Sequence, residues 1–428
     1  MITHIRMKNF KSWQESPEVR LAPLTGFFGT NSSGKSSLLQ MLLLLKQTAE
    51  RSDPNEVIFF GDENSPVNLG DFSEVIHGHQ LSSALYLKIK CKLNHSFALL
   101  TTPPQITHFA FDTVIRENNG NPILERFRYR NLFSDTKIAW KDNKLFIDDQ
   151  SSILIHIQNC YGQSSKESDI SKILTLFSSA FEELFSHVYY LGPVRARPRR
   201  HYHWDGSHPE DIGRWGYKAI DALLSARVNK LTIQREEQVV PVEVQISEWL
   251  REMDLAHSFS LELNDTRGGK NYEFRIKKSE HGAKVTLADM GFGLSQFLPV
   301  LVLCYYAPEG STLILEQPGI HLHPKVQSEL ADLLIEVITK RNLQILIESH
   351  SEHLLNRLQR RVAEEKIAAD QTALYFCQHT DGVSKIDKLD MDELGNITNW
   401  PENFFGDEMG DLFAMTEAQR ERQKRTEG

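Results

Sequence analysis

The segment GTNSSGKS, residues 29–36, carries side chains that could hold the phosphates of a nucleotide. Gly29 and Gly34 let backbone N–H groups turn toward phosphate oxygens, and a helix beginning at Lys35 would add its positive end. Lys35 could reach the β- and γ-phosphates of ATP, while the Ser36 hydroxyl could hold Mg²⁺. A turn that only caps a helix is the structural alternative. The apolar strand expected before the loop and the helix after it favour nucleotide binding.

The segment STLILEQPGIHLHP, residues 311–324, predicts a buried strand that ends in one carboxylate, Glu316. The next position, where an ATP-hydrolysing enzyme would hold a second carboxylate, has the amide Gln317. A carboxylate can take a proton from the attacking water, whereas a neutral amide can only orient that water by hydrogen bonds. The sequence therefore predicts intact binding of ATP and Mg²⁺ with slow hydrolysis.

Two further segments could contact the γ-phosphate. GFGLSQ places Ser295 at the start of an apolar helix, where open N–H groups form a second anion site. Ser295 follows Lys35 by 260 positions (295 − 35). A second anion site at Ser295 would have a function if it faces a triphosphate held by another subunit. His350 follows a predicted strand and could sense the γ-phosphate or place the attacking water. A helix-capping serine and a structural histidine are the alternatives; for His350 the two interpretations are evenly balanced.

The densest basic cluster is RARPRR, which is followed by His201, Tyr202, His203 and Trp204. Arginines beside aromatic rings could grip phosphates and stack on bases. The alternative, held level with it, is a solvated loop or arginines that pair with the chain's surplus acids. The spacing of the histidines here and at His321 and His323 fits no defined metal site, so we expect no metal beyond Mg²⁺. The candidate nucleic-acid contacts are Arg195, Arg197, Arg199 and Arg200.

Strands that alternate with helices must position the phosphate loop and the acidic strand. We expect strands at residues 21–29, 311–316, 343–349 and 372–378, with a helix at 37–50 and others between the later strands. This alternation predicts a mainly parallel sheet. Residues 80–160 instead hold short alternating runs broken by Asn, Gly, Asp and Pro, which predict an antiparallel β subdomain.

Composition narrows the class of protein. The 48 basic and 57 acidic residues give a net charge of −9, which argues against coating nucleic acid through an overall positive field. Four scattered cysteines without a C-x-x-C pair favour a reducing cytoplasm. The first residues do not resemble a secretory signal, and the most apolar segments are too short to cross a bilayer, so we expect core helices and no membrane.

The order of the motifs resembles the ABC-type ATPases of the RecF, SMC and OLD group. The fit is to a bacterial branch of short, RecF-like AAA-family ATPases with an EQP-x-IHLHP segment. It covers nearly the whole chain, more loosely between residues 75 and 185. Such a resemblance implies a head-to-tail dimer, in which two nucleotides lie between the phosphate loop of one subunit and the signature helix of the other. The segments that carry it are NFKSW, GTNSSGKSS, GFGLSQ, LILEQPGIHLHP, IESHSEHLL, YLGPVRARP and ITNWPENFF.

Carried over position by position, the resemblance implies an ATP site shared by two subunits. Glu316 takes the place of the Mg²⁺-linked acid, Gln317 that of the catalytic glutamate, and His350 that of the switch histidine. Phe10 to Ser12 fall where relatives touch the adenosine. The expected ligands of ATP are Gly29, Asn31, Ser33, Gly34, Lys35, Ser36, Ser37 and, from the other subunit, Ser295.

A nearby substitute for the missing carboxylate is also absent from the loop. Gly319 stands where the branch usually has a glutamate, which leaves Glu348 and Glu352, on either side of His350, as the remaining candidates. The resulting hypothesis is a slow ATPase that dwells in its ATP-bound dimer and works as a switch.

The predicted architecture is α/β: a P-loop ABC-type ATPase head with a mixed or parallel core sheet, an antiparallel β subdomain and a helical signature subdomain. Residues 1–75 and 291–400 would form the head, the first with the phosphate loop and the second with the signature, acidic strand and switch. Residues 76–190 would form the β-rich subdomain and a connecting helix. The basic loop, a helical region and strands would occupy 191–290, and a tail 401–428.

Three uses of ATP compete. The first is a regulatory ATPase of a prokaryotic anti-phage or toxin-like operon, a homodimer or higher homo-oligomer that clamps an effector nuclease or toxin. The second is a DNA-repair clamp resembling RecF. The third, a built-in nuclease resembling OLD proteins, is disfavoured, because only 78 residues follow His350 (428 − 350) and DKLDMDE lacks the upstream glutamate motif.

Overall fold

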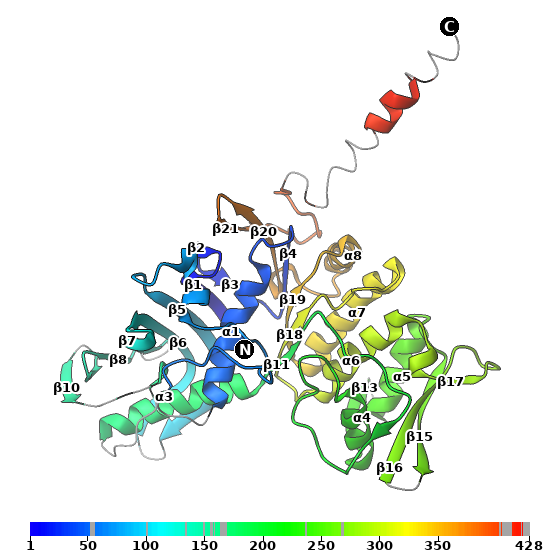
Figure 1. Ribbon diagram of the computed structural model, residues 1–428, viewed down its shortest axis with the longest axis horizontal. Coiled ribbons are helices and arrows are strands. Elements are labelled where there is room, and N and C mark those ends of the chain that lie inside the picture. Colours follow the sequence, from blue (N-terminus) through cyan, green and yellow to red (C-terminus); the bar gives the residue numbers. More distant parts are fainter. Residues whose placement is uncertain are drawn as a thin grey trace.

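The computed structural model forms two lobes on either side of a central sheet (Figure 1). It describes residues 1–51, 56–99, 102–132, 135–148, 150–154, 157, 159–162, 169–235, 238–266, 269–401, 404, 413–420 and 422.

The central sheet has six strands in the order β11-β18-β19-β4-β20-β21. All neighbours are parallel except β20 and β21, which are antiparallel, so the sheet is mixed as predicted. The strands are β4 (Leu24–Gly29), β11 (Val188–Leu191), β18 (Thr312–Glu316), β19 (Gln344–Glu348), β20 (Thr372–Thr380) and β21 (Val383–Leu389).

Apolar side chains leave both faces of this sheet. In β18, Ile314 belongs to the core beside α1, whereas Leu313 and Leu315 belong to the core that contains α6. Burial on both faces explains why these strands are continuously apolar. The most apolar segments, LLQMLLLLK and FLPVLVLCYYA, fall on α1 and α6, which are core helices as expected. The helices around the sheet are α1 (Lys35–Glu50), α6 (Phe292–Tyr306), α7 (Pro324–Arg341) and α8 (Glu352–Ala363).

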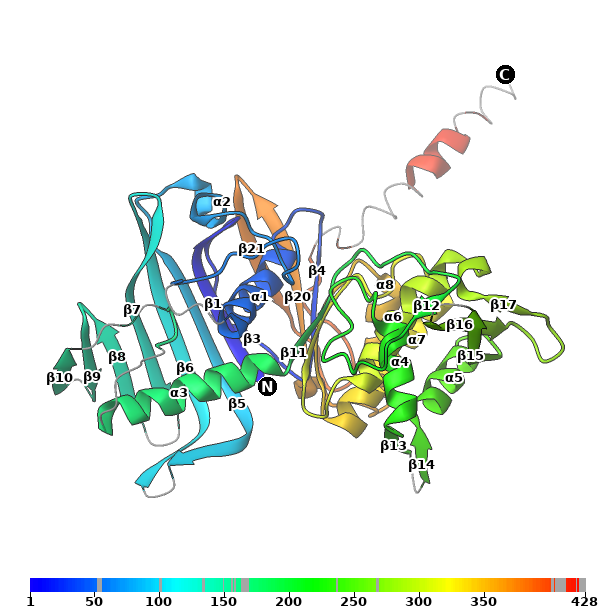
Figure 2. The same cartoon turned by 60° about the horizontal axis from the view of Figure 1, so that its bottom comes forward.

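A nine-stranded sheet builds one of the two lobes, the one at the left of Figure 2. Its path is β10-β9-β8-β7-β6-β5-β1-β2, with β3 beside β1, and all its pairs are antiparallel. Because β1 pairs with β5, this sheet crosses the predicted division at residue 75. The strands are β1 (Ile2–Phe10), β2 (Trp13–Glu15), β3 (Val19–Arg20), β5 (Leu85–Leu99), β6 (Thr102–Asn118), β7 (Asn121–Asn131), β8 (Lys137–Lys141), β9 (Lys144–Ile147) and β10 (Gln150–Leu154).

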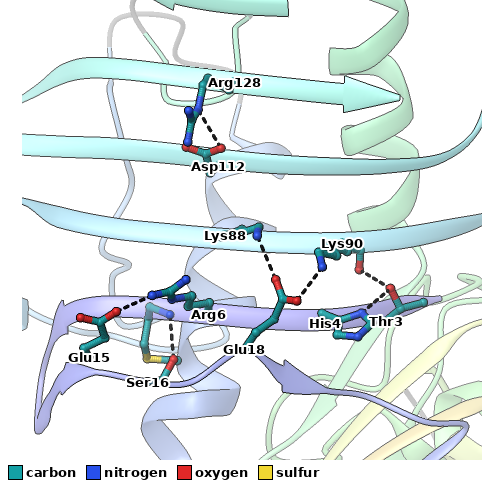
Figure 3. A network of polar contacts seen from close by, with 11 residues as sticks. Thr3, His4, Arg6, Glu15, Ser16, Glu18, Lys88, Lys90, Asp112 and Arg128 are labelled. Atoms are coloured by element: carbon teal, nitrogen blue, oxygen red, sulfur yellow. Dashed lines mark hydrogen bonds and ion pairs between the residues drawn. The ribbon is translucent and has the colours of Figure 1, made fainter. Parts of the chain in front are cut away.

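The two faces of the nine-stranded sheet differ in chemistry. Helix α3 (Asp169–Ser186) covers one face, where its Phe177 and Phe181 pack against Phe109 and Phe111. Charged side chains pair across neighbouring strands, as between Asp112 of β6 and Arg128 of β7, and Glu18, which directly precedes β3, contacts two lysines of β5 (Figure 3). This sheet therefore has an apolar side for packing and charged positions stabilised by ion pairs.

The second lobe contains smaller elements. Its sheets are β12-β16-β15, with β17 beside β16, and the hairpin β13-β14.

Among the described residues, no helix is both long enough and apolar enough to span a membrane. A C-terminal helical stretch covers 413–420. The remaining elements are α2 (Phe72–Val75), α4 (Ala219–Val228), α5 (Val242–Glu252), β12 (Tyr202–His203), β13 (Thr232–Arg235), β14 (Gln238–Pro241), β15 (Ser258–Thr266), β16 (Gly269–Lys277), β17 (Lys284–Thr286) and 3-10 turns at His77–His79, Leu287–Asp289 and Ala369–Gln371.

Candidate nucleotide site

The phosphate loop lies between the end of β4 and the start of α1. Lys35 is buried, and its Nζ donates hydrogen bonds to the carbonyl oxygens of Gly29 at 3.1 Å and Thr30 at 2.6 Å. Gly34 has φ +91°, and a Cβ there would lie 2.4 Å from Ser384 Oγ. Only glycine meets both conditions, so this position is fixed by backbone geometry and by close packing.

A cavity of about 280 Å³ lies over this loop. Its lining includes most of the residues predicted to bind nucleotide and brings them together with His350, the predicted switch residue. Lys11 and Ser12, from the segment expected near the adenosine, also line it, and Lys11 Nζ donates to Gln40 Oε1 at 2.7 Å. The predicted residues in the lining are Asn31, Ser33, Gly34, Lys35, Ser36, Ser37 and His350.

Residues on both sides of the loop in the sequence, one near and one distant, contact it or its neighbours. Trp13 Nε1 donates to the Gly34 carbonyl at 3.1 Å, and Ser384 Oγ donates to Ser12 Oγ at 2.7 Å. Trp13 of β2 therefore bonds to the phosphate loop directly, whereas Ser384 of β21 packs against Gly34. The sequence motif alone gave no sign of either residue.

Two glutamates end neighbouring strands beside the loop. Glu316 of β18 and Glu348 of β19 are paired in register, and both are buried. Ser36 Oγ donates to Glu348 Oε2 at 2.7 Å, whereas the Tyr190 hydroxyl donates to Glu316 Oε1 at 3.0 Å. Burial raises the pKa of both carboxyls, and the negative charge of Glu348 adds to the rise for Glu316, whose pKa reaches about 7. A cation placed beside them would favour their ionised forms.

Gln317 and His350 follow these two strands. The Gln317 N–H donates to the Glu348 carbonyl at 2.9 Å, and φ of Gln317 is +49°, in the left-handed region. This turn carries the chain away from the strand directly after Glu316. Partial burial lowers the pKa of His350, and the charge of Lys35 lowers it further. A neutral imidazole can accept or donate a hydrogen bond near the phosphates without adding charge.

The comparison with known families agrees with this geometry. Residues 1–355 match the model of the AAA ATPase domain. The chain belongs to that family. Residues 367–415 of the ATPase also match a family described as a protein of unknown function. No curated protein matches the chain.

Solved structures similar to the ATPase are heads of SMC proteins. One is an SMC head bound to the C-winged helix domain of ScpA, at 13% identity and TM-score 0.47, covering 91% of this chain and 98% of that one. Another is the SMC head domain from Thermotoga maritima, at 13% identity and TM-score 0.39, with 91% and 99% covered. A third, from Pyrococcus furiosus with ScpA, has 12% identity and TM-score 0.38, with 91% and 96% covered.

Ser295 of the ATPase lies in the first turn of α6 and is not part of the lining of the cavity over Lys35. Its Oγ donates to the Phe292 carbonyl at 2.8 Å. Phe292 is 54% exposed, and its ring packs edge-on against His321 at 5.0 Å between centroids. Ser295 is buried, and its hydroxyl is bonded within its own helix and does not line the cavity over Lys35 of the same chain.

The basic loop of the ATPase differs from the prediction at one position. Arg195 is buried, and its Nη2 donates to the main-chain oxygen of Glu316 at 3.2 Å. It supports the end of β18, so the interpretation of Arg195 as a surface contact for nucleic acid is wrong. Arg197, Arg199 and Arg200 are exposed, and Arg200 forms two hydrogen bonds with Asp289.

Proposed function

We propose that this ATPase binds ATP with Mg²⁺, hydrolyses it slowly, and uses an ATP-bound homodimer as a switch that regulates a partner effector in prokaryotic anti-phage defence. The observation that carries ATP binding is the cavity over the phosphate loop, which gathers Lys35, Ser36 and His350. The backbone groups of the loop and the start of α1 suit a triphosphate, and Ser36 suits its Mg²⁺.

Slow hydrolysis is supported by the amide at position 317. Its side chain makes no hydrogen bond within the described part of the chain, and its neutral amide has no charge with which to accept a proton. Multiple-turnover measurements on the purified protein test this. We expect slow turnover, and an acceleration on Gln317→Glu of the order of 10² to 10⁴, the usual range of general-base catalysis. Gln317→Ala is the matched control and should not accelerate. Rapid turnover by the wild type would contradict the proposal.

A dimer is supported by the position of Ser295 outside the lining of the cavity over the phosphate loop of its own chain. The exposed ring of Phe292 and the adjacent His321 offer an apolar contact at the same end of α6. Light scattering with and without ATP tests this. We expect an ATP-dependent dimer that is lost in Phe292→Asp, while binding of ATP by the monomer is retained. An unchanged dimer in this variant would contradict the proposed face.

Regulation of an effector would follow if the proposed slow hydrolysis keeps the protein in its ATP-bound state. The test is co-purification with the product of a neighbouring nuclease or toxin gene, in ATP and after ATP is removed. We expect association that depends on ATP and fails in Lys35→Ala. A repair or replication neighbourhood without such a partner would favour the clamp function instead.

DNA binding is the second candidate, and two exposed arginines favour it. The Ala196 N–H donates to the Trp215 carbonyl at 2.8 Å, so the loop carrying Arg197 lies against a segment with an exposed indole. Phosphate contacts make affinity fall steeply with salt, by about one unit of log–log slope per contact. We would expect Arg197→Ala and Arg199→Ala to reduce that slope more than Arg200→Ala, because Arg200 is already paired with Asp289. Binding without salt dependence would exclude this function.

A further inference from the structure

A buried arginine at the carboxyl end of the central sheet has hydrogen-bond donors without partners. Arg195 is 5% exposed, and only one of its guanidinium nitrogens donates, from Nη2 to the Glu316 carbonyl at 3.2 Å. Its Nε and Nη1 are buried and make no hydrogen bond within the described part of the chain. Because a buried charge is costly unless it is paired and hydrogen-bonded, these two nitrogens require an acceptor.

A second buried arginine shows what a structural role looks like. Arg341 donates from Nη1 to the Cys304 carbonyl at 2.6 Å and from Nη2 to the Ala307 carbonyl at 2.9 Å, at the C-terminal end of α6. Only its Nε lacks a partner among the described residues. Arg195 makes one longer bond where Arg341 makes two. Support of the end of β18 therefore uses only a small part of the donors of Arg195.

The loop that carries Arg195 is held by its backbone. The Gly192 N–H donates to the Arg214 carbonyl, and the Ala196 N–H donates to the Trp215 carbonyl, both at 2.8 Å. These bonds lie on either side of Arg195 in the sequence and fix residues 192–196 against residues 214–215. The guanidinium is therefore anchored independently of its bond to β18, and it can exchange that bond for another acceptor while the loop stays in place.

A neighbouring carboxylate does not neutralise this guanidinium. Glu316 is close enough to Arg195 to interact with it electrostatically, but Glu316 Oε1 accepts the Tyr190 hydroxyl at 3.0 Å. No carboxylate pairs with the Nε or Nη1 of Arg195 in the described part of the chain. A buried acid and a buried cation thus lie near each other without forming an ion pair. This arrangement leaves the acid available for a cation and the guanidinium available for an anion.

The position of Arg195 favours a phosphate as that anion. The Glu316 carbonyl that it contacts is followed by the Gln317 N–H, which donates to the Glu348 carbonyl at 2.9 Å. Glu348 lines the cavity over the phosphate loop, and Lys11, another lining residue, interacts electrostatically with Glu316. Arg195 is not part of that lining, but a single turn of the chain connects it to the wall of the cavity.

We propose that Arg195 forms an oxyanion site beside the turn that follows β18, and that its ligand is a phosphate group. The guanidinium exchanges its bond to the Glu316 carbonyl for charge-assisted hydrogen bonds to phosphate oxygens, which are shorter and stronger. The phosphate is either the terminal phosphate of bound ATP or the inorganic phosphate released from it. The inference rests on the proposed binding of ATP and adds a contact that ADP alone cannot make.

The test compares nucleotides with and without the terminal phosphate. Isothermal titration with Mg²⁺ measures affinity for a non-hydrolysable ATP analogue and for ADP. We expect Arg195→Gln to lower affinity for the analogue by about 10-fold to 100-fold, the size of one charge-assisted hydrogen bond, and to change ADP affinity by no more than about twofold. Arg195→Lys should retain part of the preference for the analogue. Arg200→Gln, on the same loop but paired with Asp289, is the matched control and should resemble the wild type.

A second arm of the experiment identifies the source of the phosphate. ADP affinity is measured with and without inorganic phosphate in the wild type and in Arg195→Gln. If the ligand is the released phosphate, inorganic phosphate should tighten ADP binding in the wild type only, while both proteins bind the analogue equally. If the ligand is the terminal phosphate, the loss should appear with the analogue.

Equal losses of affinity for the analogue and for ADP would mean that Arg195 only supports the fold, and they would overturn the inference. Unchanged affinities in both arms would overturn it as well. If Arg195→Gln does not fold, Arg195→Lys takes its place with a smaller expected loss. A wild type that binds ADP as tightly as the analogue and does not respond to phosphate would overturn the inference without any variant. A wild type that binds neither nucleotide would instead refute the proposed function, so the two failures are distinguishable.

Discussion

Glutamates in the two large sheets show opposite behaviour. At the end of the six-stranded sheet, burial raises the pKa of Glu316 and Glu348. In the nine-stranded sheet, burial of Glu18 acts in the same direction, but hydrogen bonds from Lys88 and Lys90 outweigh it and lower its pKa to about 2 (Figure 3). The difference is the supply of cations. Glu18 has two permanent partners within the protein, at 2.8 and 2.6 Å.

The carboxylates of the central sheet have weaker compensation. Glu316 and Glu348 are beside each other, and like charges in a buried site disfavour ionisation. Their hydrogen-bond donors are the hydroxyls of Tyr190 and Ser36, which are neutral. A cation bound from outside the chain would therefore stabilise the ionised forms of these two carboxylates more than that of Glu18. The comparison therefore separates ion pairs that stabilise the fold from carboxylates that are left available for a ligand.

The largest expected effect is on ATP affinity, when the lysine of the phosphate loop and a lysine beside Glu18 are each replaced by alanine. Lys35→Ala would remove the proposed charge-assisted contacts to the phosphates, each of which contributes about 1.5 to 3 kcal/mol, so ATP affinity should fall by about 10² or more. Lys88→Ala is the matched control and should leave ATP affinity unchanged. Isothermal titration with ATP and Mg²⁺ measures both. Equal ATP affinities for the wild type and Lys35→Ala would contradict the proposed difference between Lys35, which binds a ligand, and Lys88, which only stabilises the fold.

A smaller effect is expected on the pH dependence of stability of the metal-free protein. Because the pKa of Glu316 rises from 4.5 to about 7 on folding, the native state holds more protons in this window, and stability falls as pH rises through it. The shift corresponds to a cost on the order of 3 kcal/mol above pH 7. Thermal unfolding in EDTA should show a weaker decline from pH 5 to 8 in Glu316→Gln. Parallel curves for wild type and variant would contradict the raised pKa.

The smallest effect is expected at Glu18, with the opposite sign. Its lowered pKa contributes stability that is present above about pH 4.5 and is lost as pH falls toward 2. The group is partly exposed, so solvent limits the contribution to about 1 kcal/mol or less. Glu18→Gln should therefore be slightly less stable than wild type at pH 7 and similar to it near pH 2. Denaturant unfolding at both pH values, repeated in high salt, measures the difference and its screening.

The sequence predicted the elements of the head well, because their signals are local. The phosphate loop, the buried strand ending at Glu316 and the helix after Gly291 each depend on neighbouring residues. Contacts between distant segments could not be predicted. Ser36 and Glu348 are 312 positions apart, and a single sequence contains no signal that pairs them.

The misassignment of Arg195 has the same origin. Within a cluster of arginines its spacing looks like that of Arg197 and Arg199, and only the path of the loop after β11 takes its guanidinium inward beneath β18. Composition gives the charge of a segment, but the direction of each side chain depends on how the backbone turns. The pairing of β1 with β5 was likewise hidden, since antiparallel strands far apart in the chain carry no shared motif.

The central claim is that each nucleotide site is completed by a second copy of the chain. Mixing two inactive variants tests it most directly: Lys35→Ala lacks a working phosphate loop, and Ser295→Arg blocks the signature serine. In a mixed dimer, the loop of the second variant meets the unaltered serine of the first. We expect each variant alone to lack ATP hydrolysis and the mixture to recover part of it. Two folded variants that stay inactive when mixed, or Ser295→Arg that hydrolyses ATP normally by itself, would contradict the account.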